Sequence, residues 1–524
     1  MTKVAVSITE KSWIDQLTAI KKVDHQADFI ELRLDYLEDV DLKIDADTIL
    51  LQAVETSSRP LIFTYRSNLA EPFPNRTAQN IGRLLSMRSD VKSDNPESLS
   101  GVLAEDFFDF DHSSDSTVAL HLYLTYVRIF KKYPKIILSH HDFQVCNRQE
   151  LEKIYSRLQV FTPDIIKIAA TANCQKDNLT MLGLLKGSQT GRLIVIAMGE
   201  QGKISRLFAP MCGSFLTFSS LSVDKQAAPG QMTLDDMFEL YKIKSIHRDT
   251  NIYALLGFPV SHSLSPHIHN AAFVARGLNS RYLPVSVASD ELADFVRLFI
   301  KPSTKEMEWN YKGASITVPH KVAITKLLDY IDPEAAKIGA VNTLVVDGDK
   351  LCGYNSDISG AMHPLEKVFG QLQDAKVAVL GAGGAARAVV TGLIARRAYI
   401  TVFGRNIDQD FEKKFGVKVL PFEQAAKATA DILINTTPIG MKNWQSDQPV
   451  PIASRSIKNF KLVYDLVYNP LETALLKEAR QAGIGILGGL DMFIAQAAEQ
   501  FRLWTGQDAP SELMYEVAMQ ILSN

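Results

Sequence analysis

The chain has 524 residues, of which 46% are hydrophobic, and a formal net charge of -3. Such a composition predicts a globular protein of about two to four domains. No basic stripe or long run of like charges occurs, so we expect neither a nucleic-acid nor a membrane partner. The 4 cysteines lack CxxC spacing, which argues against a disulfide framework or a zinc site, and we expect no bound metal.

The N-terminal residues lead directly into a strand pattern, without a signal or transit peptide. No apolar run approaches the ~20 residues that a membrane span requires. We therefore expect a cytoplasmic protein with reduced thiols, and a monomer.

Short runs rich in Val, Ile, Leu and Phe recur through the first half, with room for a helix between successive runs. The runs begin near Val4, Phe29, Leu61, Phe107, Ile136, Ile165, Leu193 and Phe215. Helical periods fit at 120–133 and 151–158, whereas 89–100 indicates only a loop or a short helix. Eight successive strand–helix units predict a closed (β/α)8 barrel of roughly 250 residues.

Polar residues close many of these runs, and the carboxyl ends of barrel strands are where catalytic groups gather. Lys167 stands inside the apolar run 165–170, where desolvation favours the neutral amine that attacks a carbonyl. A lysine that extends from a strand end toward solvent is the alternative. The other polar residues are Glu31, Arg33, Asp35, Thr64, Arg66, Asp109, Asp111, His140, His141 and Arg206.

The arginines at these strand ends indicate an anionic substrate, because guanidinium groups bind carboxylates in a bidentate manner. A histidine beside an iminium-forming lysine indicates proton abstraction next to a carbonyl carbon. Either His140 or His141 could be this base.

The first half resembles the type I 3-dehydroquinate dehydratase family. The matching strings are ELRLD at 31–35, SHHDF at 139–143, IKIA at 166–169, the stretch from 198 to 206, GSFLTF at 213–218 and APGQ at 228–231. The resemblance implies that Lys167 forms a Schiff base with 3-dehydroquinate and that His141 is the base, oriented by Asp111. It also implies that Arg66 and Arg206 hold the carboxylate, and that Glu31, Arg33 and Gln231 contact hydroxyls.

The sequence departs from this family at three places. Asp111 replaces the usual glutamate, Ala227 replaces a serine, and the Glu-Gly-Gly expected after Arg66 is absent, with 71–73 reading Glu-Pro-Phe. We expect these departures to affect substrate affinity and loop closure more than the chemistry.

A charged segment at 243–250 separates the barrel, 1–242, from a new strand at 253–257, and we predict it to be a linker. From Lys376 the chain reads strand, glycine turn, helix, which places backbone N–H groups where a pyrophosphate binds. Close packing of the turn is the alternative explanation of the glycines. After the next strand, at 399–403, Arg405 stands where an NAD site would carry an acid. This favours the 2′-phosphate of NADP, although a surface arginine would explain it too.

Residues ~250–370 carry polar motifs but no nucleotide pattern. Ser263 and Ser265 precede a predicted helix start at Pro266, where hydroxyls either bind a carboxylate or cap the helix. Lys321 and Asp357 are able to move a proton while a nicotinamide handles a hydride.

The rest of the chain resembles shikimate dehydrogenase. The matching strings are GFP at 257–259 with Ser263 and Ser265, GASITVPHK at 313–321, GAVNT at 339–343, NSD at 355–357, GAGGAA at 381–386, NTTPIGM at 435–441, VYNP at 467–470 and MFIAQ at 492–496. The resemblance implies Lys321 and Asp357 as the catalytic pair, with shikimate held by Ser263, Ser265, Thr317, Asn342, Tyr468 and Gln496. It implies cofactor contacts from Gly381, Ala382, Gly383, Gly384, Ala385, Arg405, Asn406, Thr436 and Gly489.

Two positions depart from this second family. Gln409 replaces a second basic residue, which predicts a weaker preference for NADP, and Ser315 replaces an asparagine.

Together the two resemblances predict a bifunctional enzyme of the shikimate pathway. The barrel would convert 3-dehydroquinate to 3-dehydroshikimate, and the second half would reduce that product to shikimate with NADPH. The second half would comprise a substrate domain at 251–370, completed by C-terminal helices at 490–524, and a Rossmann domain at 371–489. A catabolic quinate/shikimate dehydrogenase that uses NAD is the alternative enzyme. A metabolite sensor without turnover is disfavoured, because Lys167, His141, Lys321 and Asp357 are all present.

Overall fold

The computed structural model describes residues 2–38, 44–66, 103–112, 117–143, 147–186, 188, 191–405, 409–442 and 450–523. The chain divides into two compact units, residues 1–250 and 251–524. The segment 89–100 and Asn406 lie outside the described residues.

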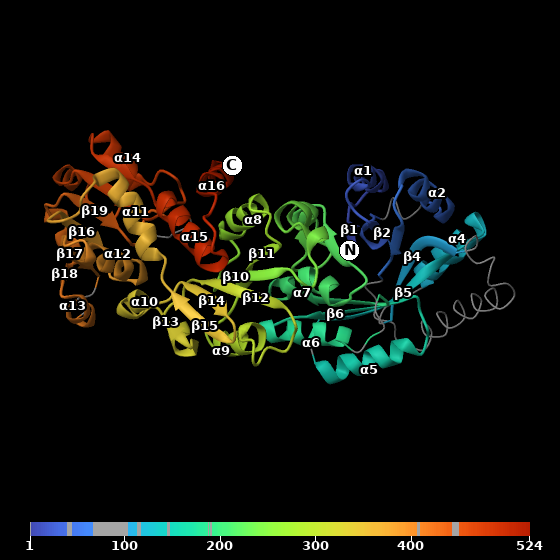
Figure 1. Cartoon of the computed structure of the whole chain (residues 1–524). Helices are drawn as coiled ribbons and strands as arrows, with labels where there is room; N and C mark the ends of the chain where they lie inside the picture. The colour runs from blue at the N-terminus through green and yellow to red at the C-terminus, as the bar shows by residue number, and fades with distance from the viewer. Residues whose placement is uncertain are drawn as a thin grey trace. The chain divides into compact units, whose positions relative to one another are not determined.

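The first unit is a (β/α)8 barrel whose parallel strands lie in the blue-to-green part of Figure 1. Its elements are β1 (Val4–Ile8), α1 (Trp13–Val23), β2 (Phe29–Arg33), α2 (Ala46–Thr56), β3 (Leu61–Thr64), β4 (Leu103–Asp111), α4 (Thr117–Phe130), β5 (Tyr133–Asp142), α5 (Arg148–Gln159), β6 (Ile165–Thr171), α6 (Gln175–Lys186), β7 (Leu193–Met198), α7 (Lys203–Phe208), β8 (Thr217–Ser220) and the short β9 (Met232–Thr233).

The curled sheet runs in sequence order from β1 to β7, and β8 returns to pair with β1 in parallel. Near the seam, the Phe215 N–H donates to Leu193 O of β7 at 2.9 Å. All eight predicted runs form strands, although the last begins at Thr217. The helix predicted at 120–133 begins and ends earlier, because Lys131 adopts a positive φ of 54° that stops it.

The predicted linker at 243–250 is packed against the barrel. Ile243 and Ile246 are buried, and the Lys244 ammonium donates to Thr2 O at 3.0 Å and pairs with Asp28. This segment therefore belongs to the first unit, which ends at Thr250.

The second unit contains two six-stranded sheets. Its elements are β10 (Asn251–Gly257), α8 (Ser265–Ala275), β11 (Ser280–Ser286), α9 (Leu292–Phe295), β12 (Asn310–Ile316), β13 (Tyr330–Ile331), α10 (Pro333–Ile338), β14 (Thr343–Asp347), β15 (Lys350–Tyr354), α11 (Asp357–Phe369), β16 (Lys376–Leu380), α12 (Gly384–Ala395), β17 (Tyr399–Gly404), α13 (Gln409–Phe415), β18 (Lys418–Pro421), β19 (Ile432–Asn435), β20 (Leu462–Asp465), α14 (Ala474–Gln481), β21 (Gly485–Leu487), α15 (Gly489–Thr505) and α16 (Ser511–Ser523).

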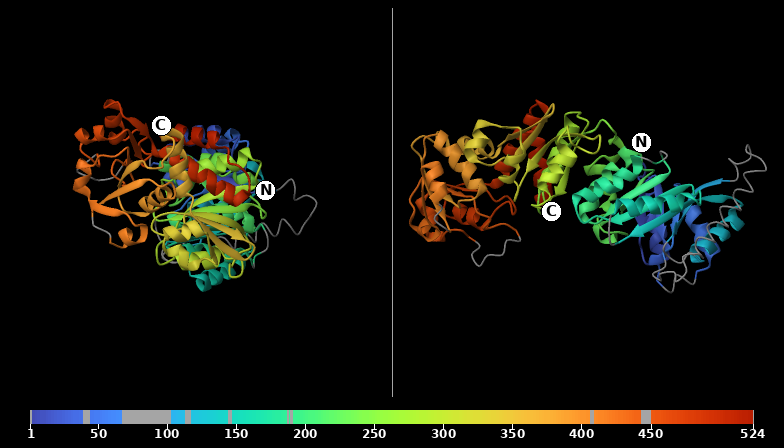
Figure 2. Two further views of the ribbon diagram at one scale, coloured as in Figure 1. Left: turned by 60° about the vertical axis from the view of Figure 1, so that its left-hand side comes forward. Right: turned by 90° about the horizontal axis from the view of Figure 1, so that it is seen from below.

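The first of these sheets has the order β11-β10-β12-β14-β15-β13 and mixes parallel and antiparallel pairs. The second has the order β18-β17-β16-β19-β20-β21 and is parallel throughout, which is the Rossmann arrangement. The two C-terminal helices, red in Figures 1 and 2, lie beside α8 of the first sheet. Phe501 of α15 and Met514 of α16 are buried in one cluster with Phe273 of α8.

Candidate functional site

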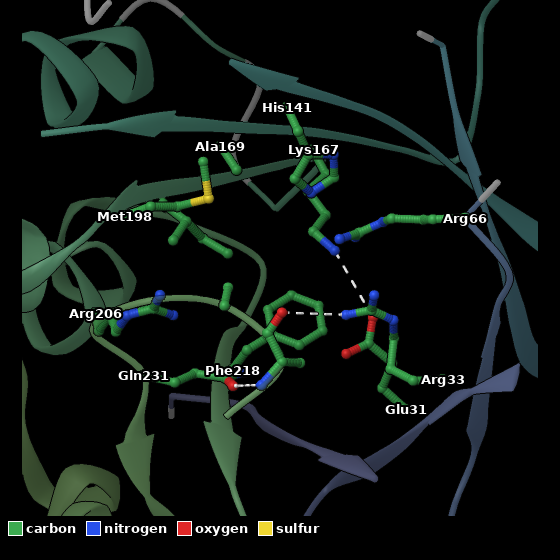
Figure 3. Close-up of a pocket in the computed structure, with 13 residues that line it drawn as sticks. Glu31, Arg33, Arg66, His141, Lys167, Ala169, Met198, Arg206, Phe218 and Gln231 are labelled. Carbon is green, nitrogen blue, oxygen red and sulfur yellow. Dashed lines mark hydrogen bonds and ion pairs between the residues drawn. The ribbon is translucent and has the colours of Figure 1, made fainter. Parts of the chain in front are cut away.

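The barrel interior changes from apolar to polar along several strands, among them β2, β4 and β6. Alternate residues of a strand point to the same face, so the inward row of β6 reads Ile165, Lys167, Ala169. The rows of β2 and β4 begin with Phe29 and Phe107, whose ring centroids lie 5.8 Å apart. This apolar floor leaves the polar positions that follow it at the carboxyl ends of the strands, where a pocket opens (Figure 3).

The pocket collects most of the residues predicted for the barrel. It is lined by Glu31, Arg33, Arg66, His141, Lys167, Ala169, Ile196, Met198, Arg206, Phe218, Ala227, Ala228 and Gln231. Asp111 reaches the pocket through His141. Of the two candidate bases, His141 lines the pocket and His140 is absent from its lining.

Lys167 is buried against charge as well as apolar surface. Its ammonium Nζ lies 2.9 Å from Asp109 Oδ2, 3.9 Å from Glu31 Oε1 and 4.3 Å from the centre of the Phe218 ring. A lysine at this depth requires a counter-charge, and these two carboxylates supply it. Burial raises the pKa of Asp109, but the positive charges of Lys167 and Arg66 outweigh that effect and lower the pKa to about 2. This carboxylate is therefore ionised.

His141 is held by a carboxylate. Its Nδ1 lies 2.6 Å from Asp111 Oδ2, so the shorter aspartate still reaches the ring. Burial lowers the pKa of His141, and Arg66 lowers it further, to about 4, although Asp111 opposes both effects. A neutral imidazole oriented by a carboxylate is the form that a general base requires.

The two arginines predicted to bind a carboxylate differ in their surroundings. Arg66 Nη2 lies 3.4 Å from Asp109 Oδ2, and Arg66 Nε lies 3.9 Å from Asp111 Oδ2. Arg206 is 2% exposed and donates to Pro229 O at 3.2 Å, while its buried Nε has no hydrogen-bond partner among the described residues. Burial lowers the pKa of Arg206 to about 10, so the group remains charged at neutral pH. A buried cation with an unsatisfied N–H fits an anionic ligand.

Two side chains of the site have no role predicted from the sequence. Asp109 stands at a predicted strand end, two residues before Asp111, and so shares its face of β4. Ser7 is buried in β1, where its hydroxyl donates to Glu31 Oε2 at 2.5 Å and accepts from Gln231 Nε2 at 3.1 Å. No pattern around Ser7 distinguishes it from an ordinary strand residue.

A second polar group lies in the other unit. Lys321 Nζ and Asp357 Oδ2 are 2.5 Å apart, and Asn342 Nδ2 donates to Asp357 Oδ1 at 2.8 Å. Gln496 of α15 lies 3.5 Å from the Ser356 hydroxyl, beside this pair. The lysine side chain is 23% exposed and the aspartate 9%, so the lysine is the one that reaches solvent.

The remaining predicted substrate residues are placed by other contacts. The Ser263 hydroxyl accepts the Ser265 N–H at 3.2 Å. Ser265 itself does not cap α8, because the N-cap position is Leu264, whereas the Ser263 hydroxyl accepts the first helical N–H. Thr317 follows β12 on the loop that leads to Lys321, and Tyr468 stacks on Phe493 at 4.8 Å.

The glycine turn after β16 has the geometry that a pyrophosphate requires. Gly381 has a φ of 103°, and a Cβ there would lie 2.7 Å from the Thr436 hydroxyl. At Gly383 and Gly384 a Cβ would meet no described atom within 4 Å, so the amino end of α12 is open. Open backbone N–H groups at a helix N-terminus bind phosphate. This turn lies between β17 and β19, where the strand order reverses.

The other predicted cofactor residues vary in position. Ala382 and Ala385 are half-buried beside the turn, and Arg405 is exposed at the end of β17. Gly489 begins α15, where a Cβ would lie 2.3 Å from Leu466 O, so close packing alone requires glycine there.

In the described ranges, no group of three His, Cys, Asp or Glu side chains is arranged to hold a metal ion. No helix of those ranges combines the length and hydrophobicity needed to cross a membrane.

Comparison with known families matches both units. Residues 4–248 match the model of type I 3-dehydroquinase, and residues 255–344 match the shikimate dehydrogenase substrate binding domain. Residues 364–446 match the model of shikimate / quinate 5-dehydrogenase, and residues 489–519 match the shikimate 5'-dehydrogenase C-terminal domain.

Individual relatives extend the match to the whole chain. A chloroplastic bifunctional 3-dehydroquinate dehydratase/shikimate dehydrogenase of Arabidopsis thaliana is 32% identical, over 96% of this chain and 82% of the relative. Shikimate dehydrogenase (NADP(+)) of Oleidesulfovibrio alaskensis is 41% identical over 49% of this chain and 91% of its own. A crystal structure of shikimate 5-dehydrogenase from Thermus thermophilus, in complex with NADP(H) and shikimate, is 32% identical over 51% of this chain and 98% of that one, with a TM-score of 0.46. The chain therefore belongs to the family of bifunctional 3-dehydroquinate dehydratase/shikimate dehydrogenases.

Proposed function

We propose that the barrel dehydrates 3-dehydroquinate through a Schiff base at Lys167, and that the second unit reduces the resulting 3-dehydroshikimate to shikimate with NADPH. The main support for the proposed dehydratase activity is the pocket in which Lys167 faces His141 and two carboxylates. The Lys321–Asp357 pair supports the second half.

In the barrel, the Lys167 amine attacks the substrate ketone and a water leaves, which forms an iminium cation. The carboxylates of Asp109 and Glu31 stabilise that positive charge, since they already face Nζ at 2.9 and 3.9 Å. His141 removes the proton next to the iminium carbon and returns it to the departing hydroxyl, so a second water leaves. Hydrolysis of the imine then releases the enone and restores the lysine.

The substrate carboxylate pairs with Arg206 and Arg66. The orphaned Nε of Arg206 supports this assignment. Glu31, Arg33 and Gln231 bind the ring hydroxyls. Ser7 holds Glu31 and Gln231 together, so it orients two of these contacts at once.

In the second unit, the group that NADPH supplies is a hydride for the ketone carbon. Lys321 donates the proton to the ketone oxygen and recovers one from solvent, which its exposed ammonium can reach. Asp357 keeps Lys321 oriented, and Asn342 holds Asp357. Ser263, Ser265, Thr317, Tyr468 and Gln496 complete the shikimate site.

The glycine turn supports the pyrophosphate contacts, which we assign to the residues from Gly381 to Ala385 together with Thr436 and Gly489. Arg405 and Asn406 bind the 2′-phosphate, and Asn406 lies outside the described residues. The substrate domain spans 251–370 with 490–524, and the nucleotide domain spans 371–489.

The proposal also includes that the protein is a monomer and that it is located in the cytoplasm. Light scattering of the purified protein and imaging of a tagged copy would check those two points.

The test of the combined function starts from purified protein, 3-dehydroquinate and NADPH. We expect loss of NADPH absorbance and formation of shikimate, whereas a cofactor panel in which only NADH works would favour the catabolic quinate enzyme. No product with either cofactor would exclude the proposed sequence of reactions.

The Schiff base has a separate test. Borohydride added with 3-dehydroquinate should fix a covalent adduct whose mass maps to Lys167. The matched control is Lys135→Ala, because Lys135 also stands on a barrel strand, 5.2 Å from the Phe107 ring, but does not line the pocket. An adduct that persists in Lys167→Ala would refute the assignment.

A further inference from the structure

Two loops of the nucleotide domain are tied together by one buried pair of side chains. Asn435 ends β19 and Asp465 ends β20, and the two residues stand opposite each other in the parallel register. Both are fully buried. The Asn435 Nδ2 donates to Asp465 Oδ1 at 2.8 Å, so the side chains of the strand ends are joined directly.

The Asn435 amide also makes hydrogen bonds to the loop that follows β19. Its Oδ1 accepts the Thr437 N–H at 3.0 Å and the Thr437 hydroxyl at 2.7 Å. Its Nδ2 also donates to Ile439 O at 3.2 Å. This loop, residues 436–441, begins with Thr436, whose hydroxyl donates to Leu380 O at 2.6 Å beside the glycine turn. We call it the cofactor loop.

Asp465 organises the loop that follows β20 in the same way. Its Oδ1 accepts the Val467 N–H at 3.1 Å, and its Oδ2 accepts the Thr473 hydroxyl at 2.6 Å. These bonds fix both ends of residues 466–473, the segment that carries Tyr468. We call it the substrate loop. The N–H of Lys442, the residue after the cofactor loop, donates to Asn469 O of the substrate loop at 2.8 Å.

We infer that Asn435 and Asp465 are a positioning pair that couples the cofactor loop to the substrate loop. The affinity for shikimate then depends on the conformation of the cofactor loop, and the affinity for NADP+ on that of the substrate loop. The inference rests on the proposed function of the second unit. Neither side chain is itself proposed to touch a ligand.

The chemistry of Asp465 agrees with this role. Every donor that reaches the carboxylate in the described structure is uncharged: an amide, a backbone N–H and a hydroxyl. Burial raises the pKa of Asp465 to about 6, although these hydrogen bonds oppose the shift. An unpaired buried carboxylate is costly, and a single acceptor group that satisfies three donors, one from the end of β19 and two from the substrate loop, is a reason to keep it.

The test compares Asp465→Asn with Asp465→Ala in the full chain. An asparagine retains the Oδ1 acceptor and places an amide where Oδ2 stood, next to a hydroxyl that is able to accept. Calorimetric titration would measure the dissociation constants of shikimate alone and of NADP+ alone, and steady-state kinetics would give the reductase kcat. We expect Asp465→Ala to weaken both ligands roughly tenfold, since loss of preorganisation propagates to every group that the loops carry. Asp465→Asn should recover most of that loss for both ligands.

A variant in the cofactor loop provides an independent arm in case Asp465→Ala does not fold. Thr437→Val removes the hydroxyl that donates to Asn435 Oδ1 at 2.7 Å and accepts the Ile439 N–H at 3.3 Å. Both bonds involve only Asn435 and the cofactor loop, yet the change should also weaken shikimate, whose proposed contact Tyr468 lies on the other loop. The matched control is Ser456→Ala, which deletes the buried hydroxyl bond to Ala426 O at 2.7 Å in the same domain. It should lower stability without changing either dissociation constant.

The outcomes separate the two levels of the proposal. A wild-type protein that binds neither shikimate nor NADP+ would overturn the proposed function, and the coupling with it. A wild-type protein that binds both, while Thr437→Val and Asp465→Ala alter NADP+ alone, would overturn the coupling and leave the proposed function standing. Equal effects of Ser456→Ala and Asp465→Ala on both constants would also overturn it, because general destabilisation would then explain the loss.

Discussion

At the level of single residues, the barrel site brings together opposite charges from every second strand of the sheet, β2, β4 and β6. Glu31, Asp109 and Lys167 each follow an apolar residue of the barrel floor by two positions, so all three face inward at one level. A cation and two carboxylates at this depth satisfy one another.

Asp109 gives the first prediction. Asp109→Asn removes the carboxylate 2.9 Å from the Lys167 ammonium, and the cationic imine loses its nearest counter-charge. We expect the dehydratase kcat to fall by about 10²-fold, as for loss of one electrostatic partner of a transition state. The reductase rate of the same preparation is the internal control. An unchanged dehydratase rate would show that Asp109 only fills space.

The pH dependence of the dehydratase follows from His141. The base works as a neutral imidazole, so the rate falls when pH drops through its pKa. Because that pKa lies at about 4 instead of 6.5, we expect kcat/KM to stay constant from pH 8 down to about pH 5 and to fall below it. A pH–rate profile with half-loss near 6.5 would contradict this. Arg66→Ala removes a positive charge that lowers the pKa of His141, so it should move the acid limb of the pH–rate profile to higher pH.

Arg405 gives a prediction for the cofactor. Arg405→Ala should raise the KM for NADPH by about tenfold or more, because a charge-assisted hydrogen bond contributes roughly 1.5–3 kcal/mol. The KM for NADH should barely change, since NADH lacks the 2′-phosphate. Initial-rate kinetics with both cofactors would check this, and equal losses would remove Arg405 from the phosphate site.

At the level of elements, aspartates fasten the amino ends of the barrel strands in pairs. Asp28, Asp106 and Asp164 lie at or near the start of β2, β4 and β6, and each accepts a backbone N–H of the preceding strand at 2.7–2.8 Å. The device recurs in the nucleotide domain, where Asp431 before β19 accepts the Lys376 N–H of β16 at 2.9 Å. These bonds satisfy N–H groups at strand ends, so they support the register of the sheet.

The corresponding prediction concerns stability. Asp164→Ala leaves the Ile136 N–H without its 2.8 Å acceptor and should lower the free energy of unfolding of the barrel by about 1–3 kcal/mol. The matched control is Glu38→Ala, because Glu38 is exposed and its partner Lys11 is 3.9 Å away. Its change should stay within about 0.5 kcal/mol. Calorimetric unfolding of both variants would check the difference.

At the level of the whole molecule, the residues proposed for the dehydratase all lie in the unit of residues 1–250. Those proposed for the reductase all lie in 251–524. The C-terminal helices are part of the second unit, where the Gln500 side chain of α15 accepts the Ser315 hydroxyl of β12 at 2.8 Å and donates to Asn342 O at 3.1 Å. The two activities therefore have separate structural supports.

Separation of the activities is the last prediction. Lys321→Ala should lower the reductase kcat by about 10²–10⁴-fold, the usual contribution of proton transfer, and leave the dehydratase unchanged. A fragment of residues 251–524 should keep reductase activity, because it contains its own cores. Loss of dehydratase activity in well-folded Lys321→Ala would reveal coupling between the units.

The sequence by itself determined the succession of strands, the glycine turn and the lysines proposed to be catalytic, because hydrophobic periodicity and turn chemistry act over a few neighbouring residues. Only the tertiary structure decided which charges meet. The Asp109 partner of Lys167 is 58 residues away, and the Ser7 partner Gln231 is 224 residues away. Periodicity does not determine such distances, since they depend on how separate strands pack. The packing of the predicted linker onto the barrel, through Ile243 and Ile246, depends on the tertiary structure in the same way.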